Sequence, residues 1–133
     1  MTTQQEPPVS VKAALHCPEG WVLLKNDRNE WELPGGRVDE TDLTLEDVVR
    51  RECREELGVE VQVGPLVHAY LFEVVPGRRV TIVCFLAQTS ESSGLSISDE
   101  HDEVAVFAPE QLADLSLPTG YRDSIEQAAQ LLG

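Results

Sequence analysis

Residues 36–59 read GRVDETDLTLEDVVRRECREELGV, and this stretch decides the fold. Thr44, with Asp47 three residues on, predicts the start of a helix, because a threonine N-cap and an acidic residue at that spacing satisfy free backbone N–H groups. Gly58 predicts the end of the helix, since glycine adopts the left-handed capping conformation at little cost. A single helix is therefore expected between these two residues.

The expected helix has one broad apolar stripe, at about 100° per residue. The stripe consists of Leu45, Val48, Val49, Cys53 and Leu57. Glu52 and Glu56 fall inside its arc and Glu55 at its edge, so their carboxylates should point toward the body of the protein. Because clustered carboxylates repel, a positive partner is expected, and oxygen ligands suit Mg²⁺ or Mn²⁺. The alternative is a surface helix whose acids pair with neighbouring arginines.

Two features flanking these acids complete a longer pattern. A Pro-Gly-Gly turn at residues 34–36 precedes the helix, and the pattern R-E-apolar-x-E-E-x-G-apolar runs from Arg51 to Val59. The segment closely resembles the Nudix box, the signature of hydrolases that cut a diphosphate linkage in a nucleoside diphosphate joined to another group. The resemblance implies an α/β fold, a Nudix-like α/β/α sandwich with a mixed β-sheet flanked by helices, as a single domain over residues 9–133.

The loop before the helix departs from the family pattern, because the interval from Gly36 to Arg51 is one residue longer. Counting forward from Gly36 places Asp42 at the family's first glutamate, whereas counting back from the helix places Leu43 there. We expect a one-residue bulge in the loop, with Asp42 or Glu40 taking over the role of that glutamate.

Transferred residue by residue, the resemblance implies a metal site and a catalytic site. The implied metal ligands are a backbone carbonyl, three helix carboxylates and one late acid, namely Gly36, Glu52, Glu55, Glu56 and Glu103. The implied catalytic residues are Glu52, Arg51 and Glu55, in which Arg51 resembles the residue that orients Glu52. Glu100 and Asp102 compete with Glu103 for the late position, and a solvated acidic loop is the alternative.

The chemistry of the substrate explains the metal ions. A diphosphate repels hydroxide, so divalent cations are useful because they screen the phosphate oxygens, lower the pKa of water and hold the reacting groups in line. The resemblance thus implies a Mg²⁺- or Mn²⁺-dependent pyrophosphohydrolase that uses water directly. The alternative is a regulatory Nudix domain that binds a nucleotide or metal without turnover, with the longer loop as the sign of lost catalysis.

Substrate contacts are expected just before the box. Trp31 is a candidate for stacking on a base, and packing within the strand is the alternative, which is favoured slightly. Lys25 and Arg28 are positioned to reach phosphates, although surface solubility also explains them. Arg78 and Arg79 are expected in a solvated turn, and a homodimer in which they contact the partner's nucleotide is the alternative.

The charge composition limits the classes of partner that the chain is expected to bind. The chain has 133 residues and a formal net charge of −14, from 24 acidic and 10 basic residues. Such a surface should repel nucleic acid and anionic membranes, so a small-molecule nucleotide, carried in as its metal complex, is the expected partner.

Localisation is expected from three observations. Residues 1–8 lack the basic and apolar regions of a signal peptide and are expected to be a short disordered lead. Cys17, Cys53 and Cys84 lie far apart in apolar stretches, as do buried thiols in a reducing compartment. The longest apolar run, residues 80–87, is too short to cross a bilayer as a helix. The chain is expected to be cytoplasmic.

Other elements follow from alternation and turn signals. Strands are expected over residues 9–16, 21–25, 31–33, 60–63, 66–75, 79–88 and 104–107, and a terminal helix over 121–132. The apolar run at 80–87 predicts a strand that is covered on both faces.

Overall fold

The computed structural model of the chain describes residues 6–91 and 94–133. Its strands are β1 (Val9–Cys17), β2 (Gly20–Lys25), β3 (Trp31–Glu32), β4 (Gly35–Arg37), β5 (Gln62–Val75), β6 (Arg78–Gln88) and β7 (Glu103–Phe107). Its helices are α1 (Leu45–Leu57), the short 3₁₀ helix η1 (Pro109–Asp114) and α2 (Thr119–Leu132). Of the lead expected over residues 1–8, residues 1–5 lie outside the described part of the chain. The Pro8 carbonyl accepts a hydrogen bond of 2.8 Å from the Thr81 N–H.

One mixed sheet runs through the molecule. Its main path is β3-β2-β1-β6-β5, with β4 beside β1 and β7 beside β2. β1 and β6 are parallel, and the other pairs are antiparallel. β1 pairs with β2 only through His16 and Cys17, because its first half pairs with β4 instead. The sheet therefore divides at β1, whose first half pairs with β4 and whose end pairs with β2. Between β3, which pairs with β2, and β4, which pairs with β1, the chain crosses from one part of the sheet to the other.

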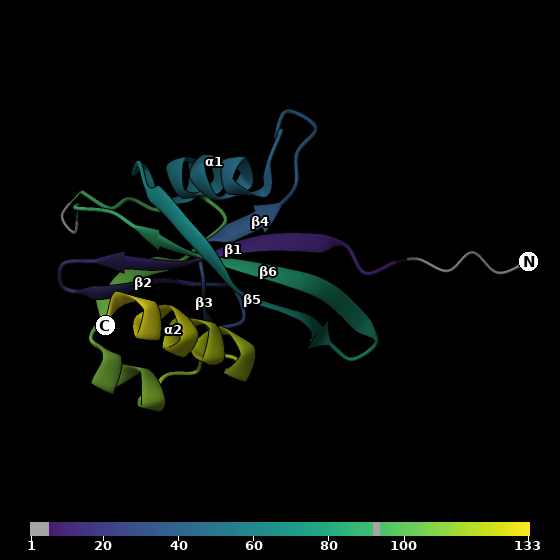
Figure 1. The fold of residues 1–133 in the computed structure, drawn as a ribbon. Helices are drawn as coiled ribbons and strands as arrows, with labels where there is room; N and C mark the ends of the chain where they lie inside the picture. Colours follow the sequence, from purple (N-terminus) through teal and green to yellow (C-terminus); the bar gives the residue numbers. More distant parts are fainter. Residues whose placement is uncertain (1–5, 92–93) are drawn as a thin grey trace, which may run out of the picture.

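The two long helices cover opposite faces of this sheet. α1 lies over one face, while α2 and η1 lie over the other (Figure 1). Toward α1 the core includes Val11, Leu15, Val48, Val49, Cys53, Leu57 and Phe85. Toward α2 it includes Ala14, Trp21, Leu23, Ile82, Tyr121, Ile125 and Ala128. The two cores confirm the α/β sandwich predicted from the sequence.

Helix α1 begins and ends where the sequence predicts. Thr44 is its N-cap, and the Thr44 Oγ accepts a hydrogen bond of 3.1 Å from the Asp47 N–H while the Asp47 carboxylate caps the Thr44 N–H. Gly58 caps the other end with a φ of 70°. Leu45 was expected in the apolar stripe, but it is 39% exposed, whereas Val48, Val49, Cys53 and Leu57 of the same stripe are buried.

Three other expectations need correction. The strands expected at 60–63 and 66–75 form one strand, β5, whose register shifts between Val63 and Leu66 because bulges absorb the residues between them. The Pro-Gly-Gly turn continues into a short strand, β4, and residues 109–114 form η1, which the sequence analysis missed.

Within the described residues, no helix is long and apolar enough to cross a membrane. The three cysteines are buried and unpaired, as expected.

Candidate active site

Glu52 and Gly36 lie against each other where α1 passes over β4. A Cβ atom on Gly36 would lie only 2.7 Å from both carboxylate oxygens of Glu52, so any larger residue at this position would collide with them. The absence of a side chain thus admits the carboxylate to the backbone. Burial raises the pKa of Glu52 above its ordinary value, and the charge of Arg51 opposes that rise.

Glu56, one turn further along α1, is only 4% exposed. Its Oε1 accepts a hydrogen bond of 2.8 Å from the Gly35 N–H. Burial raises the pKa of Glu56 to about 7, although the charge of Lys12 and the Gly35 hydrogen bond both oppose the shift. A carboxyl group with this pKa exchanges its proton near neutral pH.

Arg51 connects the loop to the helix acids. Its Nη2–H donates to Asp42 at 2.9 Å, and its Nη1–H donates to Glu52 and to Glu55, each at 3.2 Å. The Nη2–H also donates to the Arg37 carbonyl at 2.9 Å. Hydrogen bonding to Asp42, against the effect of burial, raises the pKa of Arg51 further above its usual range. The predicted contact between Arg51 and Glu52 is therefore present.

The loop has one acid that meets Arg51, and it is Asp42. The Asp42 side chain is 4% exposed, and hydrogen bonding to Arg51 lowers the pKa of its carboxyl. Leu43 is 90% exposed. Glu40 is exposed and forms no side-chain hydrogen bond or ion pair within the described residues. Of the loop residues left open by the sequence, Asp42 is thus the one that contacts Arg51.

A groove of 390 Å³ opens beside these groups. It is lined by Gly35, Gly36, Arg37, Val38, Asp39, Arg51, Glu52 and Glu100. Among the three candidates for the late acid, Glu100 is therefore the one that lines this groove. The Glu55 side chain was expected to point toward the body of the protein, but it is 57% exposed, because it lies only at the edge of the apolar stripe of α1.

Glu103, the late acid that we expected, lies elsewhere. It is the first residue of β7, and its carboxylate is 3.8 Å from the Lys25 Nζ on β2. The difference arises because β7 pairs with β2 from Glu103 onward, which directs that carboxylate to Lys25. Of the three candidate acids, only Glu100, which precedes β7, lines the groove.

The expected substrate contacts before the box do not line the groove either. Trp31 is 8% exposed, with Phe107 packed edge-on at 4.9 Å and the Lys25 Nζ 4.9 Å from the ring centroid. Its ring is thus part of the strand packing, which was the alternative. Arg28 is exposed in the turn after β2, where it pairs with Glu30 at 3.2 Å.

Arg78 and Arg79 are exposed, as expected for a solvated turn. Together with Arg37 they line a separate groove of 590 Å³ beside the start of β1.

A buried network that the sequence analysis missed lies behind the groove. The His101 Nε2 is 2.8 Å from a carboxylate oxygen of Glu32, and its Nδ1 is 3.7 Å from one of Glu56. Lys12, 8% exposed, donates to the Leu33 carbonyl at 3.2 Å. Burial favours protonation of Glu32, but the hydrogen bond from His101 and the charge of Lys12 outweigh it and lower the pKa of Glu32 to about 2.

The acids of the site are held by protein groups. Within residues 6–91 and 94–133, no three His, Cys, Asp or Glu side chains converge closely enough to hold a metal ion. The reason is visible in the contacts, since Arg51 bonds both Glu52 and Glu55 while Gly35 bonds Glu56. The groups present still fit a hard divalent cation, because they are carboxylates beside a glycine backbone that no side chain shields.

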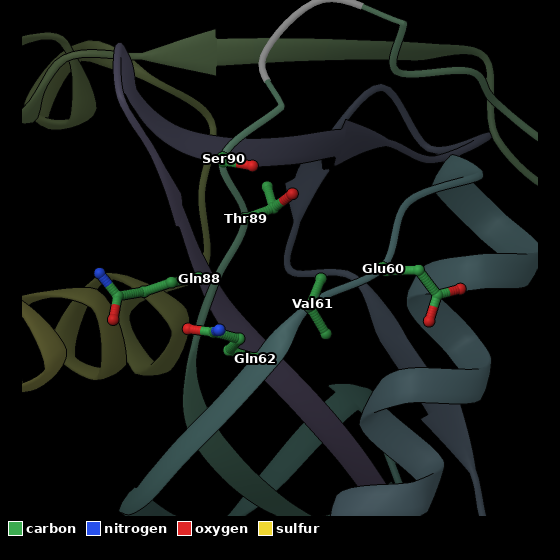
Figure 2. A pocket seen from close by; sticks show the side chains of 6 residues that line it. All are labelled: Glu60, Val61, Gln62, Gln88, Thr89 and Ser90. Carbon is green, nitrogen blue, oxygen red and sulfur yellow. The ribbon is translucent and has the colours of Figure 1, made fainter.

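A third hollow, of 460 Å³, lies where β5 begins and β6 ends (Figure 2). Gln62 and Gln88 are paired residues of these strands, and their side chains lie together in Figure 2. Glu60 points away from them toward α1, where it accepts a hydrogen bond of 2.7 Å from Arg54. None of the residues assigned to the site by resemblance lines this hollow.

Comparisons with known proteins agree with this fold and with the resemblance to the Nudix family. The NUDIX domain family matches residues 6–128. The chain is 32% identical to a MutT-like protein of Streptomyces ambofaciens over 111 residues, which cover 80% of this chain and 67% of that protein. It is 30% identical to the CTP pyrophosphohydrolase of Escherichia coli K12 over 109 residues, which cover 77% and 78% of the two chains.

Among solved structures, the MutT protein from Methanosarcina mazei Go1 superposes with a TM-score of 0.80 at 26% identity, over 98% of this chain and 99% of that chain. With the helix acids, Arg51 and the glycine turn in place, the chain belongs to the Nudix family of hydrolases.

Proposed function

We propose that this chain is a divalent-metal-dependent pyrophosphohydrolase, which uses water to cleave the diphosphate linkage of a small nucleoside diphosphate derivative. The observation that carries the proposal is the contact of the Glu52 carboxylate with the bare Gly36 backbone, in the same groove as Glu100. Gly36, Glu52 and Glu100 line the same groove, which supports a cation site built from a backbone carbonyl and carboxylates.

The proposed ligands of Mg²⁺ or Mn²⁺ all offer oxygen atoms. They are the Gly36 carbonyl and the carboxylates of Glu52, Glu55, Glu56 and Glu100, with Glu100 in place of Glu103. When bound, divalent cations neutralise the diphosphate and favour ionisation of the attacking water. Because Arg51 is also bonded to Asp42 and to the Arg37 carbonyl, it keeps its place when Glu52 and Glu55 turn to a cation.

The proposed catalytic roles follow from position. Glu52 lines the groove, and its pKa is raised by burial, which suits a group that takes a proton from water. Arg51 is 3.2 Å from Glu52 and from Glu55 and sets the direction of both carboxylates. The water attacks the phosphorus directly, so no covalent intermediate with the protein forms.

The longer loop does not argue for a purely regulatory domain. Asp42 supplies the ion pair to Arg51 despite the added residue, so the support for the helix acids is intact. The net charge of −14 favours a small nucleotide over nucleic acid. The three unpaired thiols favour a reducing compartment such as the cytoplasm. Residues 9–133 are proposed to act as one domain.

The test is a product assay over a panel of nucleoside diphosphate derivatives with Mg²⁺, Mn²⁺ or chelator. Nucleoside triphosphates head the panel, because one relative is a CTP pyrophosphohydrolase. We expect nucleoside monophosphate to be released from at least one compound with metal, and none with chelator. Absence of turnover over the whole panel would leave a binding module as the better interpretation.

A further inference from the structure

His101 lies in the segment between β6 and β7, among the acids Asp99, Glu100 and Asp102 and just before Glu103, the first residue of β7. A solvated loop is the ordinary expectation for such a run, yet the His101 residue is 8% exposed. Its Nε2 is 2.8 Å from a Glu32 oxygen, and because an ionised carboxylate only accepts, Nε2–H is the donor. Its Nδ1 faces Glu56 at 3.7 Å.

The two acids that the ring spans are themselves fixed. Glu32 accepts a hydrogen bond of 2.8 Å from the Asn26 side chain, and Glu56 accepts one of 2.8 Å from the Gly35 N–H. One acid belongs to β3 and the other to α1. The imidazole therefore bonds the loop to β3 through Nε2, while Nδ1, which has no hydrogen-bond partner within the described residues, faces the Glu56 carboxylate of α1.

Glu100, the residue before His101, gains its position from this attachment. Its carboxylate lines the groove with Glu52, but it forms no side-chain hydrogen bond or ion pair within the described residues. Like charges in one groove repel, so Glu100 needs an external restraint. Ser96 ties the start of the segment to the end of α1, since its N–H and its Oγ–H donate to the Leu57 carbonyl at 3.0 and 3.2 Å. On the side of Glu100 that leads to β7, the restraints are the His101 contact with Glu32 and the Asp102 N–H, which donates to the Lys25 carbonyl at 2.9 Å.

We propose that His101 is a positioning residue, which spans Glu32 and Glu56 and thereby holds Glu100 at the groove to complete the cation site. The part of this inference that concerns the cation rests on the proposed function. The attachment of the loop by His101 does not, and it is measurable without metal or substrate.

The first measurement is amide hydrogen exchange of residues 98–103 in the full chain with chelator present. We expect His101→Ala to speed exchange of this segment by about 10-fold or more, because local opening becomes easier. His101→Gln, whose amide still donates to Glu32, should retain part of the protection and guards against simple misfolding. Asp99→Asn, an exposed residue of the same loop, is the control and should match the wild type. Wild-type exchange in both His101 variants would overturn the proposal.

The second measurement is Mn²⁺ affinity by calorimetry for the wild type, His101→Ala, Glu100→Gln and the double variant. We expect each single variant to bind about 10-fold more weakly, as outer contacts of metal sites do, and the double variant to bind no more weakly than either. A purely electrostatic effect of His101 on the cation predicts no such loss of Mn²⁺ affinity, because removal of a neutral or positively charged imidazole does not make the site more repulsive to a cation. Full additivity of the two losses would overturn the proposal.

The two measurements separate the failures. A wild-type chain that binds no Mn²⁺ and hydrolyses nothing overturns the proposed function and the role of Glu100. If the wild type binds Mn²⁺, but no more tightly than His101→Ala does, only the positioning role of His101 is overturned.

Discussion

Asp42 and Arg51 form a two-pronged ion pair, in which the Arg51 Nη2–H donates to Oδ2 at 2.9 Å and the Nε–H donates to Oδ1 at 3.1 Å. Two parallel hydrogen bonds fix the guanidinium plane as well as its position. The remaining edge of the guanidinium is thereby aimed at Glu52 and Glu55. The loop acid thus acts on the helix acids through Arg51.

We therefore expect Asp42→Ala to lower kcat by about 10-fold, because an Arg51 released from Asp42 would hold the Glu52 and Glu55 carboxylates less firmly. Steady-state kinetics with the best substrate of the panel measures this. Glu40→Ala is the matched control in the same loop and should keep wild-type kcat. The opposite pattern, with Glu40 sensitive and Asp42 tolerant, would show that the loop bulge lies elsewhere.

Removing the charge of the inward acids tests the centre of the site. Glu52→Gln and Glu56→Gln should each lower turnover by at least about 100-fold, a loss of roughly 2.7 kcal/mol or more in transition-state stabilisation. Glutamine keeps the size of the side chain but cannot take a proton from water. Glu46→Gln, in the first turn of the same helix, should have wild-type turnover. Equal rates for all three variants would remove the proposed roles of Glu52 and Glu56.

Much of this site could be predicted from one stretch of sequence, because a helix repeats its contacts within a few residues. The caps at Thr44 and Gly58, the inward placement of Glu52 and Glu56, and the neighbouring Arg51 all follow from that repeat. The order of the strands and the continuity of β5 do not, since they depend on pairing between segments far apart in the chain.

The buried network behind the groove was beyond local patterns for the same reason. His101 and Glu32 are separated by 69 positions and meet only because β7 and β3 both pair with β2. The sequence analysis chose Glu103 as the late acid, whereas Glu100 lines the groove, because the start of a strand cannot be fixed to a single residue from sequence. A one-residue difference in strand position decides which acid faces which side.

Divalent cations should stabilise the chain against heat. A cation that binds only the native state adds about 2.7 kcal/mol at a concentration 100 times its Kd. We expect the Tm to rise with millimolar Mg²⁺ or Mn²⁺ and to return on addition of chelator. Differential scanning fluorimetry measures both, with Na⁺ at matched ionic strength as the control. A flat response would count against a cation site.

Gly36 offers a sharper test of the same site. Its conformation needs no glycine by its φ angle, so the cost of Gly36→Ala comes from the Cβ that would lie 2.7 Å from the Glu52 carboxylate. We expect this variant to fold, to lose most of its Mn²⁺-dependent rise in Tm and to lower turnover by at least about 10-fold. Gly64→Ala, where the nearest atom would be 3.3 Å away, is the control. Normal cation stabilisation of Gly36→Ala would separate Glu52 from the cation site.

The pKa of Glu56 predicts how stability depends on pH. Its ordinary value is 4.5, and burial raises it to about 7 in the native chain. Below pH 4.5 the group is protonated in both the native and the unfolded chain and costs nothing. As pH rises from 4.5 to 7, the unfolded chain ionises first, so the native state loses stability, and above pH 7 the loss is constant. Glu32 behaves oppositely, since its pKa is lowered to about 2 and its contribution is lost only in acid.

Glu56→Gln should therefore be more stable than the wild type at pH 8, by up to about 3 kcal/mol, and should match it at pH 4.5. The glutamine oxygen can still accept from the Gly35 N–H, so the native hydrogen bond is kept while the buried charge is removed. Denaturant unfolding with chelator at the two pH values measures the difference, and Glu46→Gln controls for the loss of a charge from α1. A difference of the same size at both pH values would mean that Glu56 titrates near its ordinary value, and that burial does not hold a proton at this position. The gain in stability would accompany the loss of turnover expected for the same variant, because the buried charge that destabilises the native chain at pH 8 is the one that the cation site requires.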